Sequence, residues 1–176
     1  MSKTGSGKTH AFLLPIFNDL DEMDKNCQAV IVAPTLELAR QIYKVAQHIA
    51  SFSPEAITIK AYYGGTDMVR EMEKIKTNPP QIVVATPGKL VDLVVDENVL
   101  KIHLAKYFVI DEADMVADSF LEEVFKISEK FKTAKKMVFS ATIRESLEQL
   151  LRKFLSNTVT LQVEKKDVSS LKIEHY

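Results

Sequence analysis

The beginning of the chain carries residues that could bind the phosphate groups of a nucleotide. The run reads Ser2-Lys3-Thr4-Gly5-Ser6-Gly7-Lys8-Thr9. In a loop of this kind, backbone N–H groups surround phosphate oxygens at the start of the next helix, and the glycines allow a close approach. Lys8 would place its ammonium group against the β- and γ-phosphates, and Thr9 would offer its hydroxyl group to Mg²⁺. The simpler alternative is a Gly/Ser-rich turn that happens to precede a helix.

A second group of candidate catalytic residues, Asp111-Glu112-Ala113-Asp114, directly follows an apolar run at residues 107–110. Carboxylates at the carboxyl end of a buried parallel strand lie in the crevice where such sheets bind ligands. Asp111 could hold Mg²⁺ there, and Glu112 could orient or deprotonate an attacking water. An acidic helix start favoured by the helix dipole would give the same residues without catalysis. The phosphate-loop motif in the same chain favours the catalytic interpretation.

The elements that must position these residues can be predicted from hydrophobic patterns. Apolar runs alternate with segments of helical periodicity, which predicts an α/β fold with a mainly parallel sheet flanked by helices. Strands are predicted at residues 29–33, 57–63, 82–85, 107–110, 137–139 and 159–163. Amphipathic helices are predicted around Ile42 and around Leu147. Two pairs with capping-box spacing, Ser119 with Glu122 and Thr142 with Glu145, predict helix starts.

Composition limits the classes of protein to which the chain could belong. Its 176 residues, 46% of them hydrophobic, can bury one substantial core but are few for two domains. We expect one domain at residues 1–163 and a polar linker at 164–176. The 23 basic and 24 acidic side chains nearly cancel, so a nucleic-acid site would have to be a local patch. With Cys27 as the only cysteine and no apolar run of membrane-spanning length, we expect a cytoplasmic protein with no membrane partner. We also expect the protein to be a monomer.

Several motifs in order resemble those of the first RecA-like domain of DEAD-box RNA helicases. They are S-K-T-G-S-G-K-T, A-P-T-L-E-L-A-R-Q, the pair Gly64-Gly65, T-P-G-K, D-E-A-D and S-A-T. The resemblance covers essentially the whole chain and is closer to bacterial than to eukaryotic members. It implies a P-loop NTPase fold of the RecA-like type, in an ATP-dependent enzyme that binds single-stranded RNA by its backbone and separates short duplexes.

The resemblance also implies roles for individual residues. ATP and Mg²⁺ would be bound by Thr4, Gly5, Ser6, Gly7, Lys8, Thr9 and Asp111, with Thr9 and Asp111 at the metal and Glu112, Lys8 and Asp111 in catalysis. The RNA backbone would lie along Pro34, Thr35, Gly65, Thr86, Pro87, Gly88 and Lys89. Hydrolysis would be coupled to strand separation by Asp114, Ser140 and Thr142. Simpler alternatives exist for these residues too, including a helix cap at Thr142 and ordinary turns at Gly64-Gly65 and Thr86-Pro87-Gly88.

The chain departs from the family pattern at several places. Leu36 stands where the family usually has arginine, and a leucine cannot contact phosphate. Lys89 replaces a second arginine, which keeps the charge but gives up bidentate geometry. We expect the chain to lack the central strand before the phosphate loop, the adenine-reading segment and the second RecA-like domain. Hydrolysis by the isolated chain should then be weak or absent, because the second domain supplies charge to the γ-phosphate.

Two other classes of function stay open on the sequence alone. One is a different P-loop NTPase, such as a DNA translocase or a small-molecule kinase, because the Lys8-Thr9 loop does not choose among them. The other is a truncated, catalytically inert module that keeps affinity for nucleotide or RNA.

Overall fold

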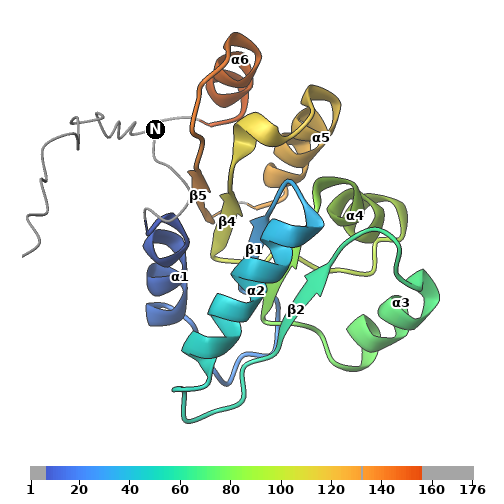
Figure 1. The fold of residues 1–176 in the computed structure, drawn as a ribbon. Coiled ribbons are helices and arrows are strands. Elements are labelled where there is room, and N and C mark those ends of the chain that lie inside the picture. The colour runs from blue at the N-terminus through green and yellow to red at the C-terminus, as the bar shows by residue number, and fades with distance from the viewer. Residues whose placement is uncertain (1–6, 132, 156–176) are drawn as a thin grey trace, which may run out of the picture.

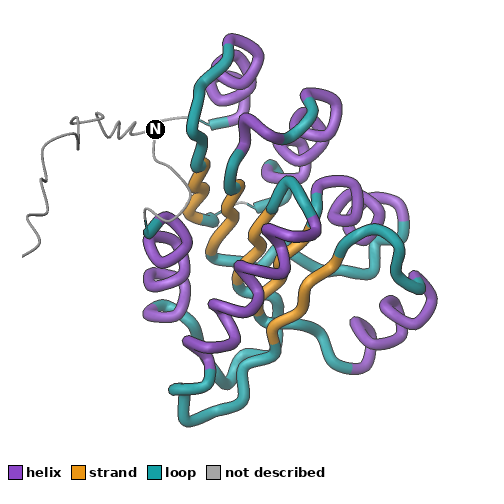
Figure 2. Tube along the Cα trace, in the orientation of Figure 1, coloured by secondary structure: helices purple, strands orange, loops and turns teal. Residues whose placement is uncertain are grey.

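Five short strands form one parallel sheet in the computed structural model, which describes residues 7–131 and 133–155 (Figure 1). The strands are β1 (Ala29–Val32), β2 (Ile59–Tyr62), β3 (Ile82–Ala85), β4 (Tyr107–Ile110) and β5 (Lys135–Val138). Their order across the sheet is β2-β3-β1-β4-β5, and every neighbouring pair is parallel. Figure 2 shows the strands side by side with helices on both faces. The predicted fold class is confirmed.

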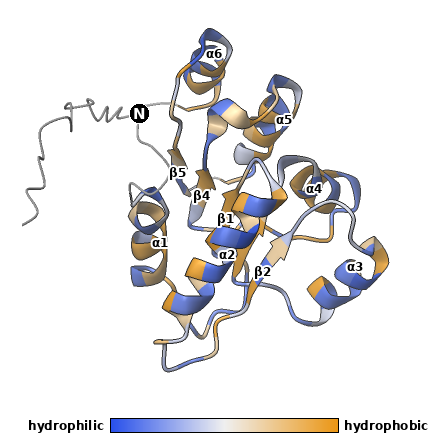
Figure 3. Cartoon of the chain, viewed as in Figure 1, coloured by the Kyte–Doolittle hydropathy of each residue, from blue (hydrophilic) through white to orange (hydrophobic). Residues whose placement is uncertain are grey.

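Helices form a layer on each face of this sheet. They are α1 (Lys8–Asn18), α2 (Leu36–Ala50), α3 (Met68–Thr77), α4 (Pro87–Val91), α5 (Asp118–Ser128) and α6 (Glu145–Phe154), with a π-helical turn at Asp92–Asp96 and a 3-10 turn at Ala113–Met115. Buried side chains of α1 and α2 pack on one face of the sheet, and those of α3 to α6 pack on the other. The helices carry polar residues on their outer sides, while the central strands β1 and β3 are apolar (Figure 3).

Alternate residues of the central strands supply the two apolar cores. On β1, Ala29 and Ile31 pack toward α1 and α2, whereas Val30 and Val32 pack toward the opposite layer. All residues of β1, β3 and β4 are buried, as expected for parallel strands covered on both faces. This double burial explains why continuous apolar runs, rather than alternating ones, predicted these strands.

Some predicted boundaries differ from the structure. β5 begins earlier and ends one residue earlier than predicted, and its residues are half-buried or exposed because it lies at the edge of the described sheet. Both predicted capping boxes are wrong: α5 begins at Asp118 after Ala117, and α6 begins at Glu145 after Arg144, with no side-chain cap at either. The strand predicted at 159–163 and the linker predicted at 164–176 lie outside the described residues. Within the described ranges, no helix is long and apolar enough to cross a membrane.

The parallel arrangement brings the chemically interesting segments to one edge of the sheet. Because all strands run in one direction, the segments after β1, β2, β3, β4 and β5 all leave from the carboxyl edge. This is the edge at which open α/β sheets bind ligands.

Candidate functional site

The described part of the phosphate loop ends at Gly7, which adopts a left-handed conformation with φ 79° and ψ 5°. This conformation carries little cost only for glycine. Gly7 is the N-cap of α1, its carbonyl accepts the Ala11 N–H group at 3.0 Å, and no side chain caps the helix. Among the described residues no side chain caps this helix start, so its first N–H groups could face an anion. Thr4, Gly5 and Ser6 lie outside the described residues.

Apolar contacts fix the position of α1 beside the sheet. Phe12, Leu13 and Ile16 on its inner face are all essentially buried. The Phe12 ring lies 5.4 Å from the ring of Phe139, the residue that follows β5. α1 thus begins near the carboxyl edge, and the charge of Lys8 acts electrostatically on Asp111. Two predicted site residues that lie far apart in the sequence, Lys8 and Asp111, are brought together here.

Asp111 is the first residue after β4, and only 3% of its surface is exposed. Its backbone N–H group donates to the Val32 carbonyl at 2.9 Å, and its Oδ1 accepts the Glu112 N–H group at 3.0 Å. Burial raises the pKa of the Asp111 carboxyl, and the Glu112 N–H group and the Lys8 charge offset this only in part. A cation close to such a buried carboxyl group favours its ionised form over its protonated form.

The oxygen atoms of Asp111 and Thr9 fit the preference of Mg²⁺ for hard ligands. Magnesium usually takes one or two protein oxygens and fills its other positions with water and substrate phosphates. In the ranges that the structure describes, no three His, Cys, Asp or Glu side chains gather into a metal site. Thr9 and Asp111 are thus the residues that could hold such an ion together with water and nucleotide phosphates.

Glu112 has an unusual backbone conformation, with φ 47° and ψ 51°. A non-glycine residue held in this region costs about 1 to 3 kcal/mol, and such residues gather at functional sites. The turn is held because the Ala113 N–H group donates to the Phe139 carbonyl at 2.9 Å. Glu112 is half-exposed at the carboxyl edge, beside Asp111. The sequence patterns predicted a role for its side chain but gave no signal of the backbone strain.

Asp114 joins the D-E-A-D segment to the S-A-T segment. Its Oδ2 accepts the Thr142 N–H group at 3.0 Å and the Thr142 hydroxyl at 2.8 Å, and its Oδ1 accepts the Ala141 N–H group at 3.3 Å. Burial opposes ionisation of this carboxyl, but the hydrogen bonds from Thr142 and Ala141 outweigh it, so the pKa of Asp114 is lowered. The Ser140 hydroxyl also donates to the Thr142 carbonyl. Thr142 therefore binds Asp114 and does not cap α6.

Most of the predicted RNA-binding residues lie on the other half of the same edge. Pro34 and Thr35 follow β1, Gly65 follows β2, and the segment 86–88 follows β3, and these three strands are neighbours. Thr35 is exposed and caps α2, because its hydroxyl accepts the Leu38 N–H group at 3.2 Å. Gly65 has φ 83°, which explains the need for glycine there. RNA contact by these residues stays a prediction.

Two predicted RNA-binding residues have structural roles that the sequence did not reveal. The Lys89 side chain is only 4% exposed, and its Nζ lies 2.7 Å from Oε2 of Glu71. The ammonium group thus points into the protein, and in this conformation it is not available to an RNA phosphate. At Gly88, an added Cβ atom would lie 3.3 Å from the Phe120 ring, so this glycine permits α4 and α5 to pack closely. Close packing of the two helices is therefore enough to explain a glycine at position 88, without any contact to RNA.

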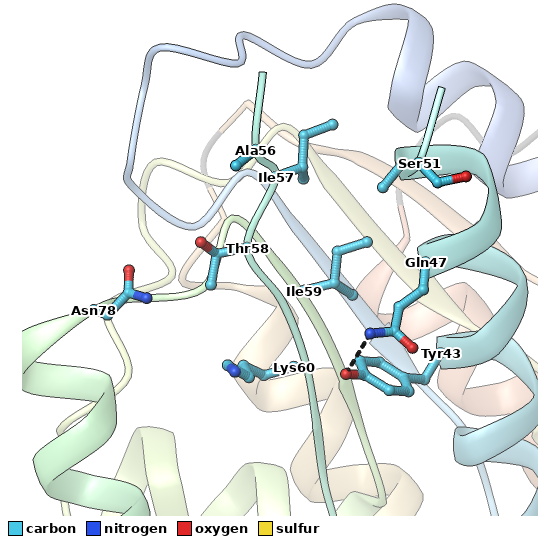
Figure 4. A pocket seen from close by; sticks show the side chains of 10 residues that line it. Tyr43, Gln47, Ser51, Ala56, Ile57, Thr58, Ile59, Lys60 and Asn78 are labelled. Atoms are coloured by element: carbon cyan, nitrogen blue, oxygen red, sulfur yellow. Dashed lines mark hydrogen bonds between the residues drawn. The ribbon is translucent and has the colours of Figure 1, made fainter. Parts of the chain in front are cut away.

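A cavity of about 430 Å³ lies away from these residues, at the opposite edge of the sheet. It is formed where the chain enters β2 and where α2 and α3 end (Figure 4). The Gln47 amide donates to the Tyr43 hydroxyl at 2.7 Å on its wall. None of the residues predicted to bind nucleotide or RNA lines it.

The fold and the residues at its carboxyl edge define a nucleotide-binding domain of the RecA-like class. A solved structure of S. cerevisiae Dbp5 L327V bound to Nup159, Gle1 H337R, IP6 and ADP is similar, with a TM-score of 0.79 and 31% sequence identity. The match covers 93% of this chain and 42% of that one.

Sequence comparison then gives the family. The model of the DEAD/DEAH box helicase family matches residues 1–150, and the chain belongs to this family. Similar proteins include the DEAD-box ATP-dependent RNA helicases CshB of Bacillus cereus, 43% identical, and of Bacillus subtilis, 44% identical. Each alignment covers 99% of this chain, but only 41% and 40% of those proteins. The chain thus spans about two fifths of the length of these relatives, and the predicted resemblance to bacterial members is confirmed.

Proposed function

We propose that this chain is the ATP-binding domain of an RNA helicase, which binds Mg-ATP and the backbone of single-stranded RNA. Joined to a second RecA-like domain, it would couple ATP hydrolysis to the local separation of RNA duplexes. The observation that carries the proposal is the contact of Asp114 with Thr142, which joins the segment that follows β4 to the segment that follows β5. A nucleotide-dependent change on one strand could reach the other through this contact.

The proposed roles at the nucleotide follow from charge and position. Lys8 and the first N–H groups of α1 would bind phosphate oxygens. Thr9 and Asp111 would hold Mg²⁺, which when bound neutralises phosphate charge. Glu112, half-exposed next to Asp111, would orient the attacking water and accept its proton. The location we propose is cytoplasmic, and the domain would act as a monomer.

The proposed RNA site consists of the segments after β1, β2 and β3. It offers backbone groups, glycines and hydroxyls, which suit phosphates and 2′-hydroxyls rather than base edges. Binding would therefore be independent of RNA sequence, and affinity would fall as salt concentration rises.

Replacing Leu36 with arginine tests this RNA site. Leu36 is the first residue of α2, next to the exposed Thr35, and is 40% exposed. An arginine there would add a phosphate contact, so Leu36→Arg should tighten RNA binding. It should also steepen the plot of log affinity against log salt by about 0.7, the contribution of one phosphate contact in a single strand. The measurement is a salt titration of binding to a labelled single-stranded RNA.

Leu104→Arg is the matched control for this experiment. Leu104 is 56% exposed and precedes β4, so it lies at the opposite edge of the sheet. The substitution Leu104→Arg adds the same charge away from the proposed RNA site. It should leave the slope of log affinity against log salt unchanged. Equal effects of the two substitutions would contradict an RNA site at the carboxyl ends of the strands.

A further inference from the structure

Arg144 links the segment after β5 to the segment after β4 through several hydrogen bonds. Its Nη1 donates to the Asp114 carbonyl at 2.8 Å, and its Nη2 donates to the Val116 carbonyl at 2.6 Å. Nη2 also lies 2.7 Å from Oδ1 of Asp118, and Nε donates to the Ser146 hydroxyl at 3.1 Å. Neither the phosphate-loop nor the D-E-A-D pattern pointed to this residue.

These contacts hold Asp114 from two sides. Its carboxylate accepts hydrogen bonds from Ala141 and Thr142, and its main-chain carbonyl accepts one from Arg144. The partners all belong to the short segment 141–144, which follows β5. Movement of this segment away from Asp114 would therefore break the side-chain and main-chain contacts together.

The set of hydrogen bonds that Arg144 makes requires a guanidinium group. Arginine presents several N–H donors in a rigid plane, whereas the ammonium of lysine acts as a point charge. Val116 is only 3% exposed, so its carbonyl would lose a partner that water could not easily replace. Asp118 balances the charge of Arg144 and also accepts the Ser146 hydroxyl at 3.2 Å, which ties the start of α6 to the same cluster.

We propose that Arg144 is a positioning residue that holds Thr142 against Asp114, so that the proposed coupling between nucleotide and RNA depends on it. The role of Arg144 in coupling rests on the proposed function, whereas its role in holding Thr142 against Asp114 does not. Arg144 touches neither the phosphate loop nor Asp111 in the described contacts, and it would act only through the segment 141–144.

Amide hydrogen exchange on the whole chain tests the positioning. Arg144→Ala should speed exchange of the Ala141 and Thr142 amides by about 10-fold or more, because hydrogen bonds from a charged donor are lost. Exchange in β1 and β4 should stay unchanged. Arg144→Lys should restore little of the protection. Arg152→Ala is the control, because Arg152 lies on α6 in an exposed ion pair with Glu148 and its loss should leave the 141–142 amides unaffected.

Two exchange results would overturn the positioning role. One is unchanged exchange of the Ala141 and Thr142 amides in Arg144→Ala. The other is an equal increase across β1 and β4, which would make Arg144 a general stabiliser of the fold.

ATP turnover tests the coupling in an enzyme that joins this domain to a second RecA-like domain. Arg144→Ala should lower the RNA-stimulated kcat at an unchanged KM for ATP, whereas Arg152→Ala should change neither. An unchanged kcat would overturn the coupling role even if local exchange increases. If the unsubstituted enzyme shows no RNA stimulation, the proposed function itself fails, and the exchange result still decides whether Arg144 positions Thr142.

Discussion

Replacing Glu112 with glutamine is expected to slow ATP hydrolysis by about 10²- to 10⁴-fold, the usual contribution of a general base. The substitution keeps the size of the side chain and removes the carboxylate that would accept a proton from water. Binding of Mg-ATP should be unchanged, because the proposed phosphate and metal ligands are Lys8, Thr9 and Asp111. Single-turnover hydrolysis and nucleotide binding, measured in an enzyme with both RecA-like domains, separate the two effects.

Glu123→Gln is the matched control, since Glu123 is exposed on α5, away from the carboxyl edge of the sheet. It should leave both hydrolysis and binding intact. Full turnover by the Glu112→Gln enzyme would remove the catalytic role from Glu112 and leave its strained backbone without a functional explanation.

The second large effect is expected from Lys89→Met, which should destabilise the domain by about 3 kcal/mol or more. The Lys89 side chain is 4% exposed and its partner Glu71 is 15% exposed. Glu71 Oε2 is buried, and its partner among the described contacts is the Lys89 ammonium, which compensates its charge. Removing that ammonium leaves a buried carboxylate unpaired. A loss of this size is a large part of the total stability of a typical domain, about 5 to 15 kcal/mol.

Two further variants separate this effect from a simple loss of charge. Lys126→Met breaks an exposed pair with Glu122 at 3.4 Å and should cost less than about 1 kcal/mol. The double variant Lys89→Met/Glu71→Leu removes both buried charges and should recover much of the stability. Urea unfolding of the four proteins gives the comparison. Equal costs for Lys89→Met and Lys126→Met would mean that the buried pair contributes no more than a surface pair.

The positions of the central strands along the sequence could be predicted because these strands are buried on both faces and therefore appear as continuous apolar runs. β1, β3 and β4 are covered on both faces, so their Val- and Ile-rich runs stand out against the amphipathic helices. The edge strand β5 was placed less accurately, since Lys135 and Lys136 carry no apolar signal. The alternation of apolar runs with amphipathic helices predicted a mainly parallel sheet, but it does not give the order of the strands across that sheet.

At the site, residue types were easier to predict than their contacts. The pairing of Asp114 with Thr142 was implied by the family resemblance, while local spacing pointed to a helix cap at Thr142. The cap does not form because a carboxylate from another segment competes for the same N–H and hydroxyl groups. Lys89 looked like a surface cation because its partner Glu71 lies 18 positions earlier in the sequence, on a different helix. Such long-range pairs leave no trace in local patterns.

The proposed function requires this domain to hydrolyse ATP in response to RNA. The most direct measurement is the rate of ATP hydrolysis by an enzyme that joins this domain to a second RecA-like domain, with single-stranded RNA and with DNA of the same sequence. We predict stimulation by RNA and little by DNA, and loss of the stimulated rate in Glu112→Gln. Equal stimulation by both nucleic acids, or by neither, would contradict the assignment of this chain to an RNA-dependent ATPase.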